Sequence, residues 1–107
     1  APEDQDVHDP KAWEGQNLVS PQEREQFQKL LKLGLYDSFR LFEQAPKAYS
    51  WWDYRMMAFR RNAGVRIDHV LLSKELKEKC IASSIDKTPR DWEQPSDHAP
   101  VIAQITV

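Results

Sequence analysis

The sequence of 107 residues predicts an α+β fold, in which helices are interspersed with short strands. Apolar residues recur at helical spacing after Ser20, an apolar run follows Gly64, and the residues from Val101 onward alternate between a more apolar and a less apolar face. With 40% hydrophobic residues, the chain is long enough for one modest core and too short for two ordinary domains. We therefore expect residues 1–107 to form a single unit.

The first 20 residues are predicted to be a loop over the surface, because Pro2, Pro10 and Gly15 interrupt any regular period. They hold five acidic side chains and one basic one, a net charge of -4. The remainder holds fourteen basic and twelve acidic side chains, a net charge of +2. The basic part of the chain is therefore the part that follows this loop.

A helix is predicted to begin at Pro21. Ser20 is a good N-cap, Pro21 suits the first helical position, and Glu23 completes a capping box. Gly34 supplies the left-handed residue that ends a helix. The apolar side chains of this helix are expected to pack as one stripe onto a sheet; they are Phe27, Leu30 and Leu31.

Two shorter helices and four strands complete the prediction. Asp37 can cap a helix that ends near Phe42, and Ser73 can cap one that ends near Lys79. The apolar run around Asp68 predicts that this carboxylate lies within a strand. Strands are expected near residues 49–54, 66–72, 80–86 and 100–106.

The dipeptide Asp97-His98 places an imidazole beside a carboxylate, and Asp68 is a second carboxylate that could meet it across a sheet. Such a group can transfer a proton or activate water at a phosphorus centre. Pro95 and Pro100 bracket the dipeptide and fix φ at two points, which limits its backbone freedom. The predicted chemistry is hydrolysis.

A simpler interpretation of Asp68 is an ion pair with Arg66, since residues two apart in a strand point to the same face. His69 would point to the opposite face and is not counted in the site. A carboxylate in an apolar strand normally has a partner, because burying it unpaired is costly. The residues alone leave both partners open.

Three blocks of the sequence resemble the C-terminal half of bacterial exonuclease III, in the order and with the spacing of that family. They are residues 49–55 (YSWWDYR), 62–69 (NAGVRIDH) and 95–100 (PSDHAP), and the similarity extends along the whole chain. The family comprises Mg²⁺-dependent 3′-to-5′ exonucleases that also incise DNA at abasic sites. The resemblance therefore implies a DNA repair nuclease acting on double-stranded DNA with abasic sites or 3′ ends.

The resemblance also implies a deoxyribonuclease-I-like fold, a four-layered αββα sandwich. This chain would supply its C-terminal half, roughly one sheet with its covering helices. Because the family's metal-binding Glu, an Asn and a catalytic Tyr lie upstream of the part resembled here, we expect a partial domain that is inactive alone. Its uncovered sheet face should lead to self-association or strand exchange.

Site residues follow from the same resemblance. His98 and Asp68 match the catalytic pair, in which the His contacts the scissile phosphate and the Asp orients it. Asp97 matches a candidate Mg²⁺ ligand, with Mn²⁺ as the alternative ion and the main ligands expected upstream of this chain. Trp51 matches an aromatic that lines a pocket for a flipped-out abasic sugar. Arg55 is a candidate phosphate ligand.

Two other interpretations of the function remain open from the sequence. Relatives on the same fold hydrolyse phosphoinositides or sphingomyelin, and the chain could also be a non-catalytic DNA-binding module. Arginines interleaved with aromatics around Trp51 favour DNA. Trp52 is expected in the core, because neighbours in a strand face opposite ways.

The sequence contains no apolar run of the roughly 20 residues needed to cross a bilayer. Its acidic start is the reverse of the basic start of a signal peptide. Both features predict a cytoplasmic protein without membrane contact.

Overall fold

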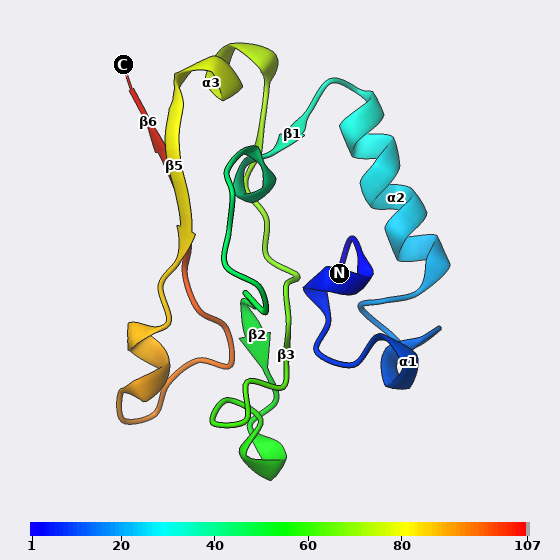
Figure 1. The fold of residues 1–107 in the computed structure, drawn as a ribbon, viewed down its shortest axis with the longest axis vertical. Helices are drawn as coiled ribbons and strands as arrows, with labels where there is room; N and C mark the ends of the chain where they lie inside the picture. The colour runs from blue at the N-terminus through cyan, green and yellow to red at the C-terminus, as the bar shows by residue number, and fades with distance from the viewer. Residues whose placement is uncertain (107) are drawn as a thin grey trace.

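The computed structural model describes residues 1–106 and has the α+β composition that the sequence predicts (Figure 1). Its helices are α1 (Pro10–Trp13), α2 (Pro21–Lys32) and α3 (Lys74–Lys79). Its strands are β1 (Tyr36–Asp37), β2 (Trp51–Trp52), β3 (Gly64–Val65), β4 (Leu71–Leu72), β5 (Cys80–Ile85) and β6 (Val101–Ile105). Single 3-10 turns cover Asp4–Asp6, Ser38–Leu41, Arg55–Met57 and Thr88–Asp91.

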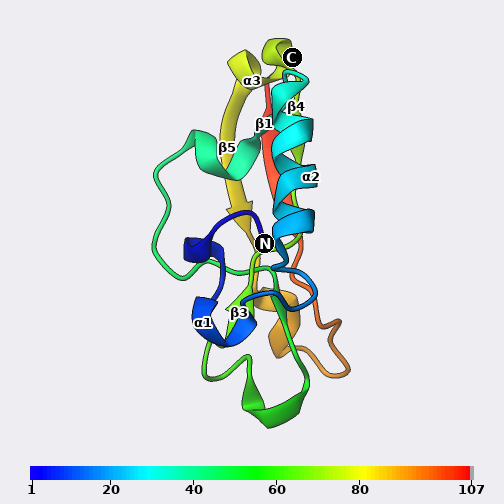
Figure 2. The ribbon, with the colours of Figure 1, turned by 90° about the vertical axis from the view of Figure 1, so that its right-hand side faces the viewer.

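The strands of residues 1–106 pair as three separate antiparallel ladders, β1 with β4, β2 with β3, and β5 with β6. The expectation of one sheet is therefore wrong for this chain, because the strands that would connect its centre are only two residues long. Figure 1 shows the β5–β6 hairpin along one edge, β2–β3 in the middle and α2 on the other side. The side view in Figure 2 shows a flat molecule, with extents of 42 × 32 × 21 Å.

The helix caps lie where the sequence predicts them. The Ser20 hydroxyl accepts a hydrogen bond from the Glu23 amide (3.2 Å), and the Ser73 hydroxyl caps α3. Gly34 ends α2 with φ +98°. However, α2 has no fully buried side chain, so the expected stripe packed onto a sheet is not observed. Phe27 instead lies against His69, with the ring centroids 4.9 Å apart.

The helix predicted after Asp37 is a single 3-10 turn, Ser38–Leu41. The Asp37 carboxylate caps this turn by accepting a hydrogen bond from the Phe39 amide (3.3 Å). The cap signal at Asp37 therefore placed the start of this element but not its type. The strands predicted near 80–86 and 100–106 are confirmed as β5 and β6, and the structure pairs them, with Ser83 of β5 opposite Ala103 of β6.

The first 20 residues form a surface segment only in part, since most of them are exposed but several side chains are buried. Val7 and Val19 are almost fully buried and pack with Val65 as one of two small core clusters. Asp6 is also buried, with 0% of its surface exposed. The apolar residues of this segment are too far apart to form a period, so their burial depends on the surface that the rest of the chain offers them.

Trp52 lies at the centre of the second core cluster with 0% exposure, as predicted, together with Tyr49, Ala58 and Ala99. Its indole Nε1 donates a hydrogen bond to the Asn62 side chain (3.0 Å). Gly64 faces this ring so closely that an added Cβ would lie 2.5 Å from Trp52 Nε1. Only glycine allows β3 to approach β2 at this position.

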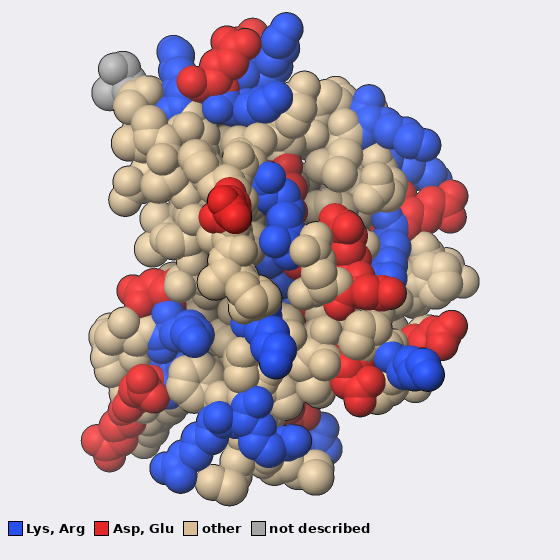
Figure 3. Space-filling view, in the orientation of Figure 1, with Lys and Arg blue, Asp and Glu red and all other residues tan. Residues whose placement is uncertain are grey.

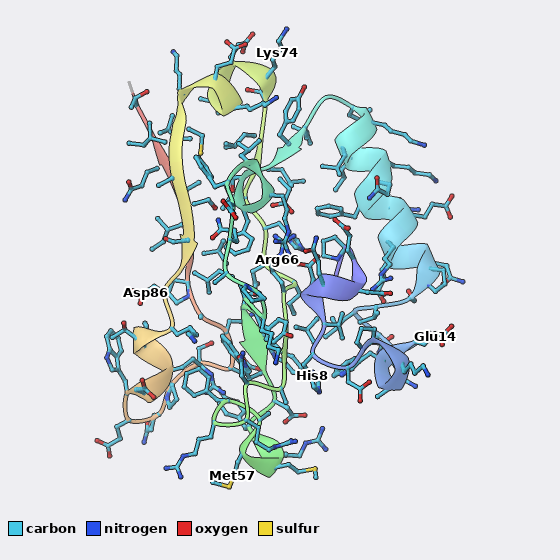
Figure 4. The ribbon with its side chains drawn as sticks, in the orientation of Figure 1. His8, Glu14, Met57, Arg66, Lys74 and Asp86 are labelled. Atoms are coloured by element: carbon cyan, nitrogen blue, oxygen red, sulfur yellow. The ribbon has the colours of Figure 1, made fainter. Side chains whose placement is uncertain are left out.

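Arg66 connects the N-terminal segment to the rest of the chain (Figure 4). Its Nε donates to Asp6 Oδ1 (2.7 Å) and its Nη2 to Asp37 Oδ2 (2.7 Å). Burial alone would lower the pKa of Arg66, but its hydrogen bonds to Asp37 and Asp6 outweigh burial and raise it. The alternative ion pair of Arg66 with Asp68 is therefore wrong.

His69 borders the same network, with Nδ1 3.2 Å from Arg66 Nη1. Burial, and then the positive charge of Arg66, lower the pKa of His69 to about 4. The ring is therefore neutral near pH 7. As predicted, His69 takes no part in the group around His98.

Candidate active site

Asp68 lies in the irregular segment 66–70 between β3 and β4, so the prediction of a strand around it is wrong. The buried Ser50 hydroxyl accepts hydrogen bonds from the amides of Ile67 (3.0 Å) and Asp68 (3.1 Å). These two amides would otherwise bond to a neighbouring strand. A side chain thus replaces a ladder partner and fixes the backbone that carries the carboxylate.

The structure brings Asp68 and His98 together, although 29 residues separate them in the sequence. His98 Nδ1 lies 2.8 Å from Asp68 Oδ2. About two fifths of each side chain is exposed, 43% for His98 and 37% for Asp68. With Nδ1 held by the carboxylate, the imidazole presents Nε2 on its other side for proton transfer or contact with an anion.

Asp97 lies on the other side of the imidazole. Its Oδ2 accepts a hydrogen bond from Trp51 Nε1 (3.0 Å), and its Oδ1 is 3.8 Å from His98 Nε2. The backbone adds two further constraints, because Trp51 forms a bridge with His98 and the Trp52 amide donates to the Asp97 carbonyl (3.1 Å). The loop that carries Asp97 and His98 is therefore tied directly to β2.

Asp97 is the carboxylate at this site that could bind a divalent cation. In residues 1–106, no three His, Cys, Asp or Glu side chains are grouped so that they could hold a metal ion. Asp97 is half-exposed, and Trp51 occupies only one of its two oxygens. Mg²⁺ prefers oxygen ligands and often takes one or two carboxylates together with water and substrate phosphates. Asp97 fits one position of such a set.

Trp51 is half-buried and lies beside a recess of about 370 Å³. The Trp13 ring meets it edge to face, with centroids 6.2 Å apart. Arg55 and Arg61 also line this recess. A flat aromatic wall with guanidinium groups beside it suits a nucleotide, whose sugar or base is apolar and whose phosphate is charged.

Arg55 is highly exposed and pairs with Asp53 through Nη2 and Oδ2 (2.8 Å). The hydrogen bonds from Arg55 lower the pKa of Asp53 to about 2. Arg60 and Arg61 are exposed on the same loop. Figure 3 shows basic side chains gathered at this end of the molecule, below β2 in the view of Figure 1.

Comparison with known proteins gives a consistent result. Residues 4–98 match the model of the "Endonuclease/Exonuclease/phosphatase family". The chain belongs to this family. It is 44% identical over 97 residues to exodeoxyribonuclease III of Haemophilus influenzae, which covers 88% of this chain and 36% of that protein. The chain thus spans about a third of the length of this curated relative.

Solved structures of family members have the same fold. The 3′ phosphatase NExo from Neisseria, bound to a product DNA hairpin, superposes with a TM-score of 0.96 and 42% identity, covering 100% of this chain and 42% of that one. An AP endonuclease from Archaeoglobus fulgidus gives a TM-score of 0.91 and 35% identity, again covering 100% of this chain and 42% of that one. The resemblance to exonuclease III and the deoxyribonuclease-I-like fold are both confirmed.

Sequence reasoning missed two residues that shape this site and one that supports the fold beside it. Ser50 holds the amide of Asp68, Trp13 packs against Trp51, and Asp6 pairs with Arg66. Ser50 lies inside an aromatic run, where a lone small hydroxyl residue is a weak signal. Asp6 and Trp13 lie in the segment that was predicted to be a surface loop, so nothing in the sequence connected them with β2 or β3.

Proposed function

We propose that this chain contributes the His98 side of the active site of a DNA phosphodiesterase that acts in base excision repair, as a 3′-to-5′ exonuclease and abasic-site endonuclease. The observation that carries the proposal is the placement of His98 between Asp68 and Asp97, with Asp97 held by Trp51. Proton-transfer, metal-binding and substrate-contacting groups thus occupy one corner of the molecule.

In this proposal Asp68 orients the imidazole through its contact with Nδ1, 2.8 Å away. The Nε2 atom then faces the scissile phosphate, where it can stabilise charge on a phosphate oxygen or move a proton from the attacking water. Ser50 acts through Asp68, since its hydroxyl fixes the amide of that residue. Substitution of Ser50 should therefore affect the orientation of His98 without removing any reacting group.

A divalent cation, Mg²⁺ or Mn²⁺, would polarise the phosphate and lower the pKa of a bound water. Asp97 would supply one oxygen ligand, and Trp51 would hold that carboxylate in place by its hydrogen bond. The remaining protein ligands would come from a part of the family fold that these 107 residues do not include.

DNA is the favoured substrate over lipid or inositol phosphates. Exposed Arg55 and Arg61 line the recess beside Trp51, and Arg60 and Met56 are exposed on the same loop, Met56 by 82%. Basic and apolar groups on one protruding loop suit contact with phosphates and stacked bases together. Several of the matched relatives are named as DNA nucleases, which supports the same choice.

We further propose that residues 1–107 form one partial domain, the C-terminal half of the family's sandwich, and that it is inactive alone and acts in the cytoplasm. No helix in residues 1–106 is long and apolar enough to cross a membrane.

The side chains of Ile81 and Ile102 on the β5–β6 hairpin are 58% and 39% exposed. Self-association through this face is expected, and light scattering over a range of concentrations tests it.

Incision of a duplex with one abasic site tests the catalytic proposal. The 107 residues are joined to the remaining part of Haemophilus influenzae exodeoxyribonuclease III in place of its matching segment, and the chain alone is assayed beside this chimera. We expect Mg²⁺-dependent incision by the chimera and none by the chain alone. His98→Ala should lower the rate by about 10²- to 10⁴-fold, the usual contribution of one proton-transfer group, while DNA binding changes little.

Lys74→Ala, at the opposite end of the molecule (Figure 4), is the matched control and should leave incision unchanged. Equal loss of incision and binding in His98→Ala would contradict a catalytic role for His98. Binding without metal-dependent incision by the folded chimera would favour a non-catalytic DNA-binding module. Preferred turnover of lipid or inositol phosphates would favour a phosphoesterase that acts on those substrates.

A further inference from the structure

Arg90 is a buried cation that the proposed site does not use. It lies in the 3-10 turn Thr88–Asp91, with 7% of its surface exposed. Three aromatic rings surround the guanidinium, whose central carbon is 4.8 Å from the ring centroid of Phe59, 5.5 Å from that of Tyr54 and 5.8 Å from that of Trp52. These rings hold the group by cation–π attraction.

The charge of Arg90 has no counterion within residues 1–106. Its Nη2 donates one long hydrogen bond to the Trp52 carbonyl (3.4 Å), and its Nε is buried without an acceptor. Ion pairs in the described chain involve the arginines at 24, 40, 55 and 66 but not Arg90. Buried charges are normally paired, and aromatic faces carry no net charge to balance a cation.

A recess of about 330 Å³ adjoins Arg90, between its turn and the loop that follows β2. Arg60 lines the same recess and adds a second positive charge. Two carboxylates also line it, but Asp53 is already paired with Arg55, so that Asp91 alone opposes the two guanidinium groups. The recess therefore suits a single anion.

We propose that Arg90 and Arg60 form a subsite for a backbone phosphate of the bound nucleic acid, separate from the phosphate at His98. This inference rests on the proposed function. The recess and the catalytic corner are joined through β2, because the Trp52 amide donates to the Asp97 carbonyl (3.1 Å) and the Tyr54 hydroxyl donates to the Pro95 carbonyl (2.8 Å). A strand whose scissile phosphate lies at His98 would pass along the exposed basic loop toward this recess.

Nitrogen-detected NMR of arginine side chains tests the subsite on the whole chain. The Nε–H signal of Arg90 is assigned by its loss in Arg90→Lys and is followed during titration with a short duplex. We expect the Arg90 signal to shift and to reach saturation as duplex is added. Arg60→Gln should weaken this binding. It should also lower the dependence of log K on log[salt] by about 0.9 per lost phosphate contact. Asp91→Asn should tighten binding by about twofold to fivefold, as expected for removing one exposed like charge.

Lys74→Gln is the charge-matched control and should change neither signal nor affinity. Both Arg60 and Asp91 are exposed, so their variants test the subsite even if Arg90→Lys does not fold. Duplex binding with a static Arg90 signal and no effect of Asp91→Asn would overturn the subsite while leaving the proposed function intact. No duplex binding by any folded form would overturn both.

A parallel titration with inorganic phosphate separates the two sources of this anion. Saturation of the Arg90 signal by inorganic phosphate at lower concentration than by duplex phosphate would overturn the assignment to a nucleic-acid backbone. A response to the duplex alone supports it.

Discussion

Arg66 and Arg90 are both almost fully buried, with 1% and 7% of their surfaces exposed, but their charges are balanced in different ways. Arg66 has Asp6 and Asp37 within 2.7 Å and so is neutralised inside the chain. Arg90 has three aromatic rings and one long hydrogen bond. The comparison indicates that Arg66 serves the fold, whereas Arg90 retains a charge that a ligand can use.

The largest expected effect comes from removing each guanidinium in turn. Arg66→Met leaves the buried Asp37 carboxylate without its ion-pair partner and Asp6 with Arg40 alone, which should lower the free energy of unfolding by about 3–5 kcal/mol. Arg90→Met removes no carboxylate pair and should cost about 2 kcal/mol, the scale of a desolvated cation–π contact. Urea denaturation of the two variants measures both values. Equal losses in the free energy of unfolding would contradict the conclusion that the charges of Arg66 and Arg90 are balanced in different ways.

The second prediction concerns a substitution that disturbs the surroundings of Arg90 and leaves those of Arg66 in place. Gly64→Ala adds a Cβ 2.5 Å from Trp52 Nε1, so the indole against Arg90 must shift. Overpacking of this kind costs about 1–3 kcal/mol. The indole N–H signal of Trp52 and the Nε–H signal of Arg90 should both move, while that of Arg66 stays.

Gly15→Ala is the control for this substitution: alanine is strained at its φ of +74°, which lowers stability locally, but a Cβ there meets no atom within 4 Å. It should leave the Trp52 and Arg90 signals unchanged. Movement of the Arg66 signal in Gly64→Ala would show that the two arginines share one packing unit.

The smallest expected effect is a pH dependence on the Arg66 side. The pKa of His69 is lowered to about 4 in the folded chain, against 6.5 for an ordinary histidine. The unfolded chain therefore takes up a proton first as the pH falls, so stability should decrease from pH 6.5 toward pH 4. Because the ring is partly exposed, solvent screening should limit the total decrease to about 1 kcal/mol.

Urea denaturation at several pH values measures this dependence. His69→Gln should flatten the slope, and His8→Gln, at an exposed histidine, should not. Unchanged slopes in His69→Gln would assign the acid sensitivity to other groups.

Short-range signals in the sequence predicted several elements correctly. Ser20, Pro21 and Gly34 fixed both ends of α2, and Ser73 fixed the start of α3. These predictions succeeded because a cap satisfies backbone amides within three residues of itself. The alternating run from Val101 onward placed β6 as well, since a period of two needs no distant partner to be recognised.

The irregular segment around Asp68 could not be predicted in this way. Its apolar neighbours are typical of a strand, but the Ser50 hydroxyl takes the amides of Ile67 and Asp68 and ends the ladder. The burial of Asp6 was missed for a similar reason, because its partner Arg66 lies 60 residues away. Hydrogen-bond partners at such separation leave no local pattern.

By itself, the sequence determined the family, the α+β class, the capped helices and the residue types available for catalysis. Those properties depend on motifs and on interactions between residues close in the chain. Only the tertiary structure decided that His98 meets Asp68, that Trp51 holds Asp97, and that Arg66 is neutralised while Arg90 is not. Contacts and burial between distant segments set these outcomes, and the energy of a buried charge depends on such surroundings rather than on neighbours in sequence.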